Sequence, residues 1–167
     1  MNDLKDGMNW APSSAKPEAV VSGEAFPFAA AFLDHGHING QTKGLKEAGG
    51  YCKWAWDPDP ERLNAFCERH GTTPAESFEQ VLEDQDIKLV TGAAVPSERA
   101  AIGFRCMRAG KDYFTDKSPF TTPEQLEEAK QVVRETGRKY MCCFGERLHS
   151  EAGWHAGELA REGVIGR

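Results

Sequence analysis

Short apolar runs alternate along this chain with longer stretches whose apolar residues recur every three or four positions. Runs of this length without polar alternation are typical of strands buried on both faces, whereas the longer stretches are typical of amphipathic helices. A strand that is followed each time by a helix favours parallel strands joined by crossover helices. We therefore expect an α/β fold with a Rossmann-type, doubly wound parallel sheet. The expected strands are 28–33, 52–56, 87–93, 112–115 and 139–144.

Capping residues and glycines indicate where the intervening helices begin and end. Asp59 and Thr122 each precede a proline, which is the pattern of a capping side chain followed by proline in the first helical turn. Ser77 and Ser97 are the expected caps of two further helices, and glycines are expected to end most of them. The expected helices cover about 38–48, 60–70, a short segment after 77, 98–109, 123–136 and 152–161; in the 123–136 helix, Leu126, Ala129 and Val133 should face the core.

Composition and charge restrict the cellular context and the partners. Residues 1–24 have no periodicity and are rich in Pro, Ser, Gly and charges, so we expect a flexible arm before one domain over 25–167. The net charge of −6 argues against binding to nucleic acid or an anionic membrane. No apolar run approaches the roughly 20 residues that cross a bilayer. Five cysteines make a poor disulfide framework, which predicts a cytoplasmic protein with reduced thiols.

The first expected strand runs into a candidate phosphate-binding turn. Dinucleotide-binding turns need glycine because the turn is tight and the backbone approaches the pyrophosphate closely. Here Gly36 stands at the middle glycine of G-x-G-x-x-G, but Asp34 replaces the first glycine and Asn39 the third. An ordinary strand-to-helix turn without a ligand explains this segment about equally well. A carboxylate at position 34 would repel phosphate unless it turns away and bonds its own turn.

Asp57 supports the dinucleotide interpretation. It follows the second expected strand, 21 positions after Gly36, where an acid can accept bonds from both ribose hydroxyls. The same carboxylate would repel a 2′-phosphate, so we expect NAD rather than NADP. The alternative is that Asp57 only starts a turn before Pro58.

His35 and His37 open a third interpretation. A His-x-His pair at the end of a strand directs both imidazoles the same way and could ligate a metal ion, as in metal-dependent hydrolases. That assignment needs further ligands at later strand ends, and the remaining histidines, His70, His149 and His155, lack suitable spacing. We therefore assign no metal ligands and expect two polar residues beside the cofactor.

Lys117 is the candidate catalytic residue. It follows Asp116 at the end of the strand 112–115, on the edge of the sheet where open α/β folds bind ligands. A lysine there can donate to a substrate hydroxyl or carbonyl, and Asp116 could hold it in place. A solvated loop lysine is the alternative.

Several segments, in order, resemble the N-terminal half of the Gfo/Idh/MocA (glucose–fructose oxidoreductase/inositol dehydrogenase) family. They are WDPDPERLNAFCERHG, AGKDYFTDKSPFTTPEQLEEAK, RETGRKYMCCFGERLH and REGVIGR, and the resemblance covers about 26–167. It implies a NAD(P)-dependent oxidoreductase acting on a sugar or polyol hydroxyl. It also implies that the family's C-terminal α+β domain, which completes the substrate pocket, is missing here. The sequence departs from the family where Asp116 replaces a glutamate, Ser118 a proline, Arg99 a histidine and Gly145 an asparagine.

The resemblance carries roles onto particular residues. Lys117 corresponds to the catalytic lysine that also contacts cofactor and substrate, and Arg147 to a substrate-binding arginine. The implied cofactor-binding residues are Asp34, His35, Gly36, His37, Ile38, Asp57, Ala94, Val95, Pro96, Asp116 and Lys117.

Two other functions stay open beside the oxidoreductase. A non-catalytic nucleotide-binding or interaction module is favoured by Asp34 and by the missing domain, and a metal-dependent hydrolase through His35 and His37 is the third. The expected partners are a dinucleotide and a small-molecule substrate. We also expect copies of the chain to associate, because a face that the second domain would cover is left open.

Overall fold

The computed structural model describes residues 18–22, 25–145, 150–164 and 166. It divides into a unit spanning Pro17–Cys143 and a second unit that includes Phe144–Arg167, and each is described by itself. Arg147 and His149 lie outside the described residues. Among the described residues, no helix has both the length and the apolar character that a membrane span requires.

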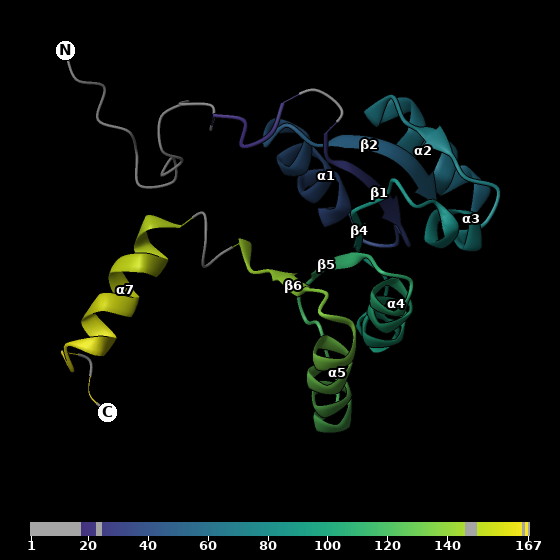
Figure 1. Cartoon of the computed structure of the whole chain (residues 1–167). Coiled ribbons are helices and arrows are strands. Elements are labelled where there is room, and N and C mark those ends of the chain that lie inside the picture. Colours follow the sequence, from purple (N-terminus) through teal and green to yellow (C-terminus); the bar gives the residue numbers. More distant parts are fainter. Residues whose placement is uncertain (1–17, 23–24, 146–149, 165, 167) are drawn as a thin grey trace, which may run out of the picture. The chain divides into compact units, whose positions relative to one another are not determined.

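The first unit is built on a six-stranded sheet with the order β3-β2-β1-β4-β5-β6 (Figure 1). Every pairing is parallel, and the order reverses between β1 and β4, which confirms the Rossmann-type fold. The edge strand β3 was not predicted, because two residues, one of them proline, leave no periodic signal. The strands are β1 Pro27–Ala31, β2 Tyr51–Trp56, β3 Thr73–Pro74, β4 Leu89–Gly92, β5 Asp112–Asp116 and β6 Tyr140–Cys143.

The helices follow the strands in alternation, as the sequence predicts. Asp59 caps α2 by accepting hydrogen bonds from the backbone of Glu61 and Arg62. Ser77 caps α3, and Thr122 caps α5. Gly71 and Gly137 stop α2 and α5 in the left-handed conformation that glycine adopts readily. The helices of this unit are α1 His37–Glu47, α2 Pro60–His70, α3 Phe78–Glu83, α4 Pro96–Arg108 and α5 Pro123–Thr136.

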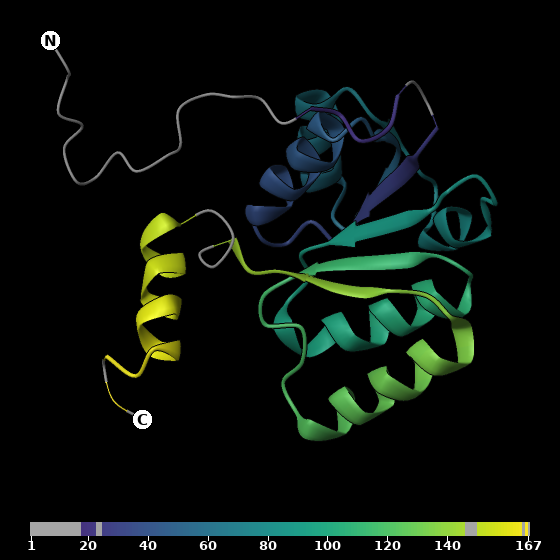
Figure 2. The same cartoon turned by 60° about the vertical axis from the view of Figure 1, so that its left-hand side comes forward.

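Helices cover both faces of the sheet (Figure 2), and a separate hydrophobic core lies on each face. Successive side chains of a strand point to opposite faces, so β1 contributes Ala29 and Ala31 to one core and Phe28 and Ala30 to the other. The first core is completed by α3, α4 and α5, and the second by α1 and α2. Helices that leave β1 and β4 therefore cover opposite faces.

Two helix details differ from the prediction. Helix α4 begins at Pro96 with Val95 as its N-cap, not at Ser97, because Pro96 favours the first helical position and keeps Val95 extended. In α5, Ala129 and Val132 are buried, whereas Leu126 is 41 % exposed and Val133 is 37 % exposed. Val132 lies three residues after Ala129, and residues three apart share a helix face, so the face that packs on the core contains Val132 and not Val133.

The second unit contains α7 Glu151–Arg161, close to the predicted 152–161. Ser150 caps it by accepting a hydrogen bond of 3.1 Å from the Gly153 backbone N–H.

Candidate functional site

The candidate site lies at the carboxyl edge of the sheet, where β1 and β4 are neighbours and their following segments diverge. Two backbone hydrogen bonds join these segments: Ala93 N–H donates to Phe32 at 3.0 Å, and His35 N–H donates to Ala93 at 3.1 Å. Open α/β sheets bind ligands at this position, where the strand order reverses. The turn 34–38 and the segment Ala94–Pro96, both predicted from the sequence to bind cofactor, therefore begin side by side at this edge of the sheet.

Gly36 is the N-cap of α1, and neither its backbone nor its neighbours require a glycine. Its φ of −58° and ψ of −17° suit any residue. A Cβ at this position would meet nothing within 4 Å. The helix end carries no side-chain cap and no acid in its first turn. The positive end of the helix dipole lies here, and the N–H groups of His37, Ile38 and Asn39 bond within the turn itself, to His35 and Gly36.

Phe32, which sequence analysis did not single out, shapes the chain before this turn. Its φ of +57° is left-handed, an outlier for a bulky residue. The ring packs edge-on against Trp56 at 5.0 Å and Phe78 at 4.9 Å between ring centroids. Aromatic packing therefore helps to hold the backbone of the turn that follows. In that turn Asp34 stands where the dinucleotide-binding motif has its first glycine.

Asp57, the predicted ribose acid, is buried and already hydrogen-bonded. One carboxylate oxygen accepts the Leu33 N–H at 2.6 Å, and the other accepts the Asp59 N–H at 2.8 Å. The second oxygen also receives Nε and Nη2 of Arg62, at 3.0 and 2.9 Å. Asp57 therefore starts the turn before α2, as its alternative assignment required, and the ribose contact stays a prediction.

Arg62 forms ion pairs with three acidic side chains at this end of the site. Its guanidinium lies 3.4 Å from Asp34, 2.9 Å from Asp57 and 3.8 Å from Asp59. The hydrogen bond with Asp57 raises the pKa of Arg62, which stays a cation. Asp34 thus turns toward an arginine and not into its own turn. A small hollow of about 160 Å³ lies beside Arg62, with Leu33, Ile38 and Phe66 among its walls.

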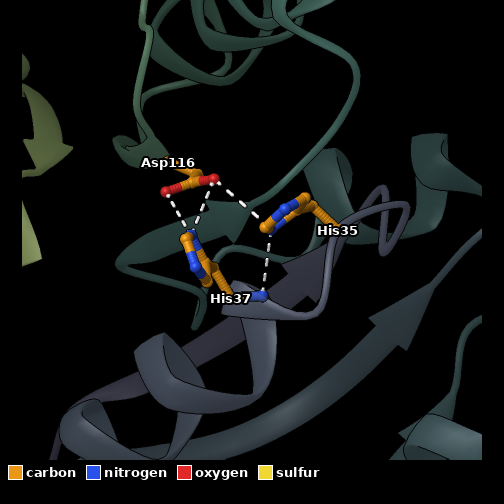
Figure 3. A group of neighbouring side chains, drawn as sticks. All are labelled: His35, His37 and Asp116. Carbon is orange, nitrogen blue, oxygen red and sulfur yellow. Dashed lines mark hydrogen bonds and ion pairs between the residues drawn. The ribbon is translucent and has the colours of Figure 1, made fainter.

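Two predicted histidines meet the predicted acid of β5 (Figure 3). Nδ1 of His37 lies 3.1 and 3.2 Å from the two carboxylate oxygens of Asp116, and Nδ1 of His35 lies 3.7 Å from one of them. Both histidine side chains are about half exposed, whereas that of Asp116 is buried. The structure therefore joins the turn after β1 to the end of β5, two strands away in the sheet.

Arg99, noted in the sequence only as a departure from the family, forms an ion pair with the acid of this cluster. Its side chain is buried and lies 3.5 Å from Asp116. The guanidinium also donates to the backbone carbonyls of Ala94, Lys117 and Ser118. It thereby ties the loop after β4 to the loop after β5, a connection that local sequence could not reveal.

Lys117, the predicted catalytic residue, follows β5 directly and is half-buried. The Lys117–Ser118 peptide bond is cis. Ala94 is buried, and Val95 and Pro96 are exposed at the start of α4. Arg147, predicted to bind substrate, lies outside the described residues.

Comparison with known proteins identifies a family and solved structures that share this fold. A family model described as "Oxidoreductase family, NAD-binding Rossmann fold" (GFO_IDH_MocA) matches residues 35–144. A solved structure of a presumed oxidoreductase from Erwinia carotovora atroseptica is 38 % identical with a TM-score of 0.75, over 85 % of this chain and 43 % of that one. Among curated proteins, none matches this sequence significantly.

More distant solved structures share the fold. A biliverdin reductase from Synechocystis, in complex with biliverdin and NADP+, is 19 % identical with a TM-score of 0.70 over 86 % of this chain and 44 % of its own. A 3-ketoreductase from Actinomadura kijaniata, in complex with TDP-benzene and NADP, is 24 % identical with a TM-score of 0.71 over 86 % of this chain and 46 % of its own. The chain thus spans less than half the length of these proteins.

Proposed function

The chain belongs to the Gfo/Idh/MocA family of NAD-binding Rossmann oxidoreductases, and from that membership we propose that it binds NAD(P) at the β1–β4 edge of its sheet. In the whole protein, this unit would serve hydride transfer between the nicotinamide and a hydroxyl-bearing carbon of a sugar or polyol. The cofactor supplies the hydride chemistry, and the protein supplies position and a path for the proton.

The observation that carries the proposal is the uncrowded glycine at the start of α1, Gly36. Glycine there has no conformational or packing reason within the described fold, since its φ is ordinary and a Cβ would meet nothing. A ligand that approaches the backbone closely is a reason for it. The positive end of the α1 dipole favours the negative charge of a pyrophosphate.

The charges around Arg62 favour NAD over NADP. One guanidinium faces three carboxylates, those of Asp34, Asp57 and Asp59, within 4 Å. The group is therefore net negative, and a 2′-phosphate at the adenosine ribose would be repelled. The ribose hydroxyls would approach Asp57, whose carboxylate is held in place by Arg62 and the two backbone amides.

The proton path is assigned to Lys117 at the end of β5. Its position on the ligand-binding edge of the sheet lets its ammonium group donate to the reacting oxygen of a substrate. Asp116 lies next to it and is fixed by Arg99 and His37. Lys117 would polarise or protonate that oxygen while Ala94, Val95 and Pro96 border the nicotinamide.

Nucleotide titration of a Gly36→Ala variant tests the cofactor site. The added methyl group has space in the fold, so stability should stay within about 0.5 kcal/mol of wild type. It should nevertheless obstruct the pyrophosphate and weaken NADH binding at least about 10-fold, measured by fluorescence or calorimetry. Gly44→Ala, farther along the same helix and equally uncrowded, is the matched control and should bind NADH normally. Equal NADH affinity in both variants would contradict the proposal.

A Lys117→Ala variant tests the catalytic assignment. In the whole protein, turnover of a responsive polyol or sugar should fall by at least about 100-fold, a much larger loss than any change in NADH affinity. If wild-type protein binds NADH but turns over no member of a polyol and sugar panel, the non-catalytic binding module is the better function.

A further inference from the structure

We propose that His35, His37 and Asp116 form a binding site for one zinc-like divalent metal ion. His35 lies in the turn between β1 and α1, His37 is the first residue of α1, and Asp116 ends β5 (Figure 3). One ligand atom from each residue lies within 4.8 Å of the others. These side chains lie at the edge where the cofactor is proposed to bind, so the site is tested on the nucleotide-free chain, where failure to bind metal leaves the cofactor proposal untouched.

The distances between the donor atoms suit a shared ion. Metal–nitrogen and metal–oxygen bonds of about 2.0–2.2 Å at tetrahedral angles place neighbouring ligand atoms roughly 3.3–3.6 Å apart. The Oδ2 atom of Asp116 lies 3.2 Å from Nδ1 of His37 and 3.7 Å from Nδ1 of His35. Small side-chain rotations would therefore bring all three atoms to one ion.

Metal binding would replace two contacts that are now present. Nδ1 of His35 accepts a hydrogen bond from the His37 backbone N–H at 3.3 Å, and Nδ1 of His37 faces the Asp116 carboxylate, so both nitrogens would exchange these partners for the ion. The rings of His35 and His37 stand edge to face, with centroids 4.2 Å apart. Their side chains are 55 % and 49 % exposed, which lets an ion enter from solvent and leaves coordination positions for water.

Asp116 has the outer support that metal-binding carboxylates require. Its side chain is only 4 % exposed and lies 3.5 Å from Nη2 of Arg99, which is itself anchored by backbone carbonyls. Such support orients a ligand before the ion arrives. Two imidazoles with one carboxylate are a ligand set for Zn²⁺, Fe²⁺ or related ions.

Two features weaken the attraction for a cation. The Arg99 guanidinium neutralises part of the Asp116 charge, and the N-terminal end of α1 at His37 is the positive end of the helix dipole. We therefore expect weaker binding than in a closed structural zinc site with four protein ligands.

Cobalt titration of the nucleotide-free chain tests the site. Co²⁺ should bind one ion per chain and produce the visible absorption bands of a four- or five-coordinate ion with nitrogen and oxygen ligands. Added Zn²⁺ should displace it and abolish those bands. A thiolate-to-cobalt charge-transfer band would instead place the ion on cysteines, and this outcome would overturn the assignment.

Single substitutions identify the ligands. His35→Ala and His37→Ala change half-exposed side chains, so both variants should fold as judged by circular dichroism. Each should weaken Co²⁺ binding at least about 100-fold, beyond the 10- to 100-fold that loss of an outer-shell partner costs. His155→Ala, on α7, is the matched control and should bind like wild type. Wild-type Co²⁺ affinity in both cluster variants, or the absence of a one-to-one complex, would refute the metal site.

Discussion

Arg62 donates two hydrogen bonds to one carboxylate oxygen of Asp57, from Nε at 3.0 Å and from Nη2 at 2.9 Å. The Asp59 N–H shares that oxygen, and the Leu33 N–H occupies the other. Asp57 thereby ties the end of β1 to the start of α2. An acid at this position thus has a structural function in the described fold, whatever it contributes to a ribose.

Replacing Asp57 with asparagine should destabilise the protein. The amide cannot satisfy both backbone N–H groups and the guanidinium, so we expect a loss of about 1–3 kcal/mol in the free energy of unfolding. Urea denaturation measures it. Asp59→Asn is the control, since asparagine caps a helix as well as aspartate does, and it should change stability by less than about 0.5 kcal/mol. Equal losses in the two variants would contradict the special role of Asp57.

Asp34→Asn should relax the cofactor preference. Removing one of the three carboxylates around Arg62 lowers the repulsion of a 2′-phosphate. Because Asp34 is partly exposed, we expect only about a 3- to 10-fold gain in NADP affinity relative to NAD. Calorimetric titration with both nucleotides provides the ratio. Glu47→Gln, at the far end of α1, should leave the ratio unchanged, and an unchanged ratio in Asp34→Asn would count against the charge argument.

Gly103 and Gly44 should respond oppositely to alanine. Both lie within helices, but a Cβ at Gly103 would overlap the rings of Tyr113 and Tyr140, whereas at Gly44 it would meet nothing. Overpacking should make Gly103→Ala about 1–3 kcal/mol less stable. Gly44→Ala should be up to about 1 kcal/mol more stable, because alanine is the better helix former. Thermal and urea unfolding check both signs, and a stabilised Gly103→Ala would show that the two tyrosines give way.

Acid should weaken the fold through Asp84. Partial burial alone would raise the pKa of this carboxyl, but hydrogen bonds from Lys53 and Trp54 outweigh it and hold the pKa at about 2, below the ordinary 3.8. A depressed carboxyl pKa contributes stability above the unfolded-chain pKa, and that contribution is lost as pH falls through the folded pKa. The two values correspond to about 2 kcal/mol at neutral pH.

The Asp84→Asn variant isolates this contribution. It should be about 2 kcal/mol less stable than wild type at pH 7, and the difference should shrink between about pH 4 and pH 2. Unfolding curves across that range measure it. A difference that stays constant with pH would mean that packing, not ionisation, explains the loss.

Local sequence was enough to predict the alternation of strands and helices, most helix limits and the residues at the strand ends. Apolar spacing, capping side chains and glycine conformations act over a few residues, so they leave a readable pattern. That is why the caps at Asp59, Ser77 and Thr122 were predicted correctly. The two-residue β3 and the rotation of α5 that buries Val132 depend on contacts with other elements, and the sequence did not predict them.

The tertiary structure alone decided which strand-end residues meet. His37 and Asp116 are 79 positions apart, and they come together because β4 lies between β1 and β5 in a parallel sheet. The sequence predicted both residues at the ligand-binding edge but offered no third ligand for the histidine pair. Strand order is set by how the helices cover the two faces of the sheet, a property of the whole fold that no short segment encodes.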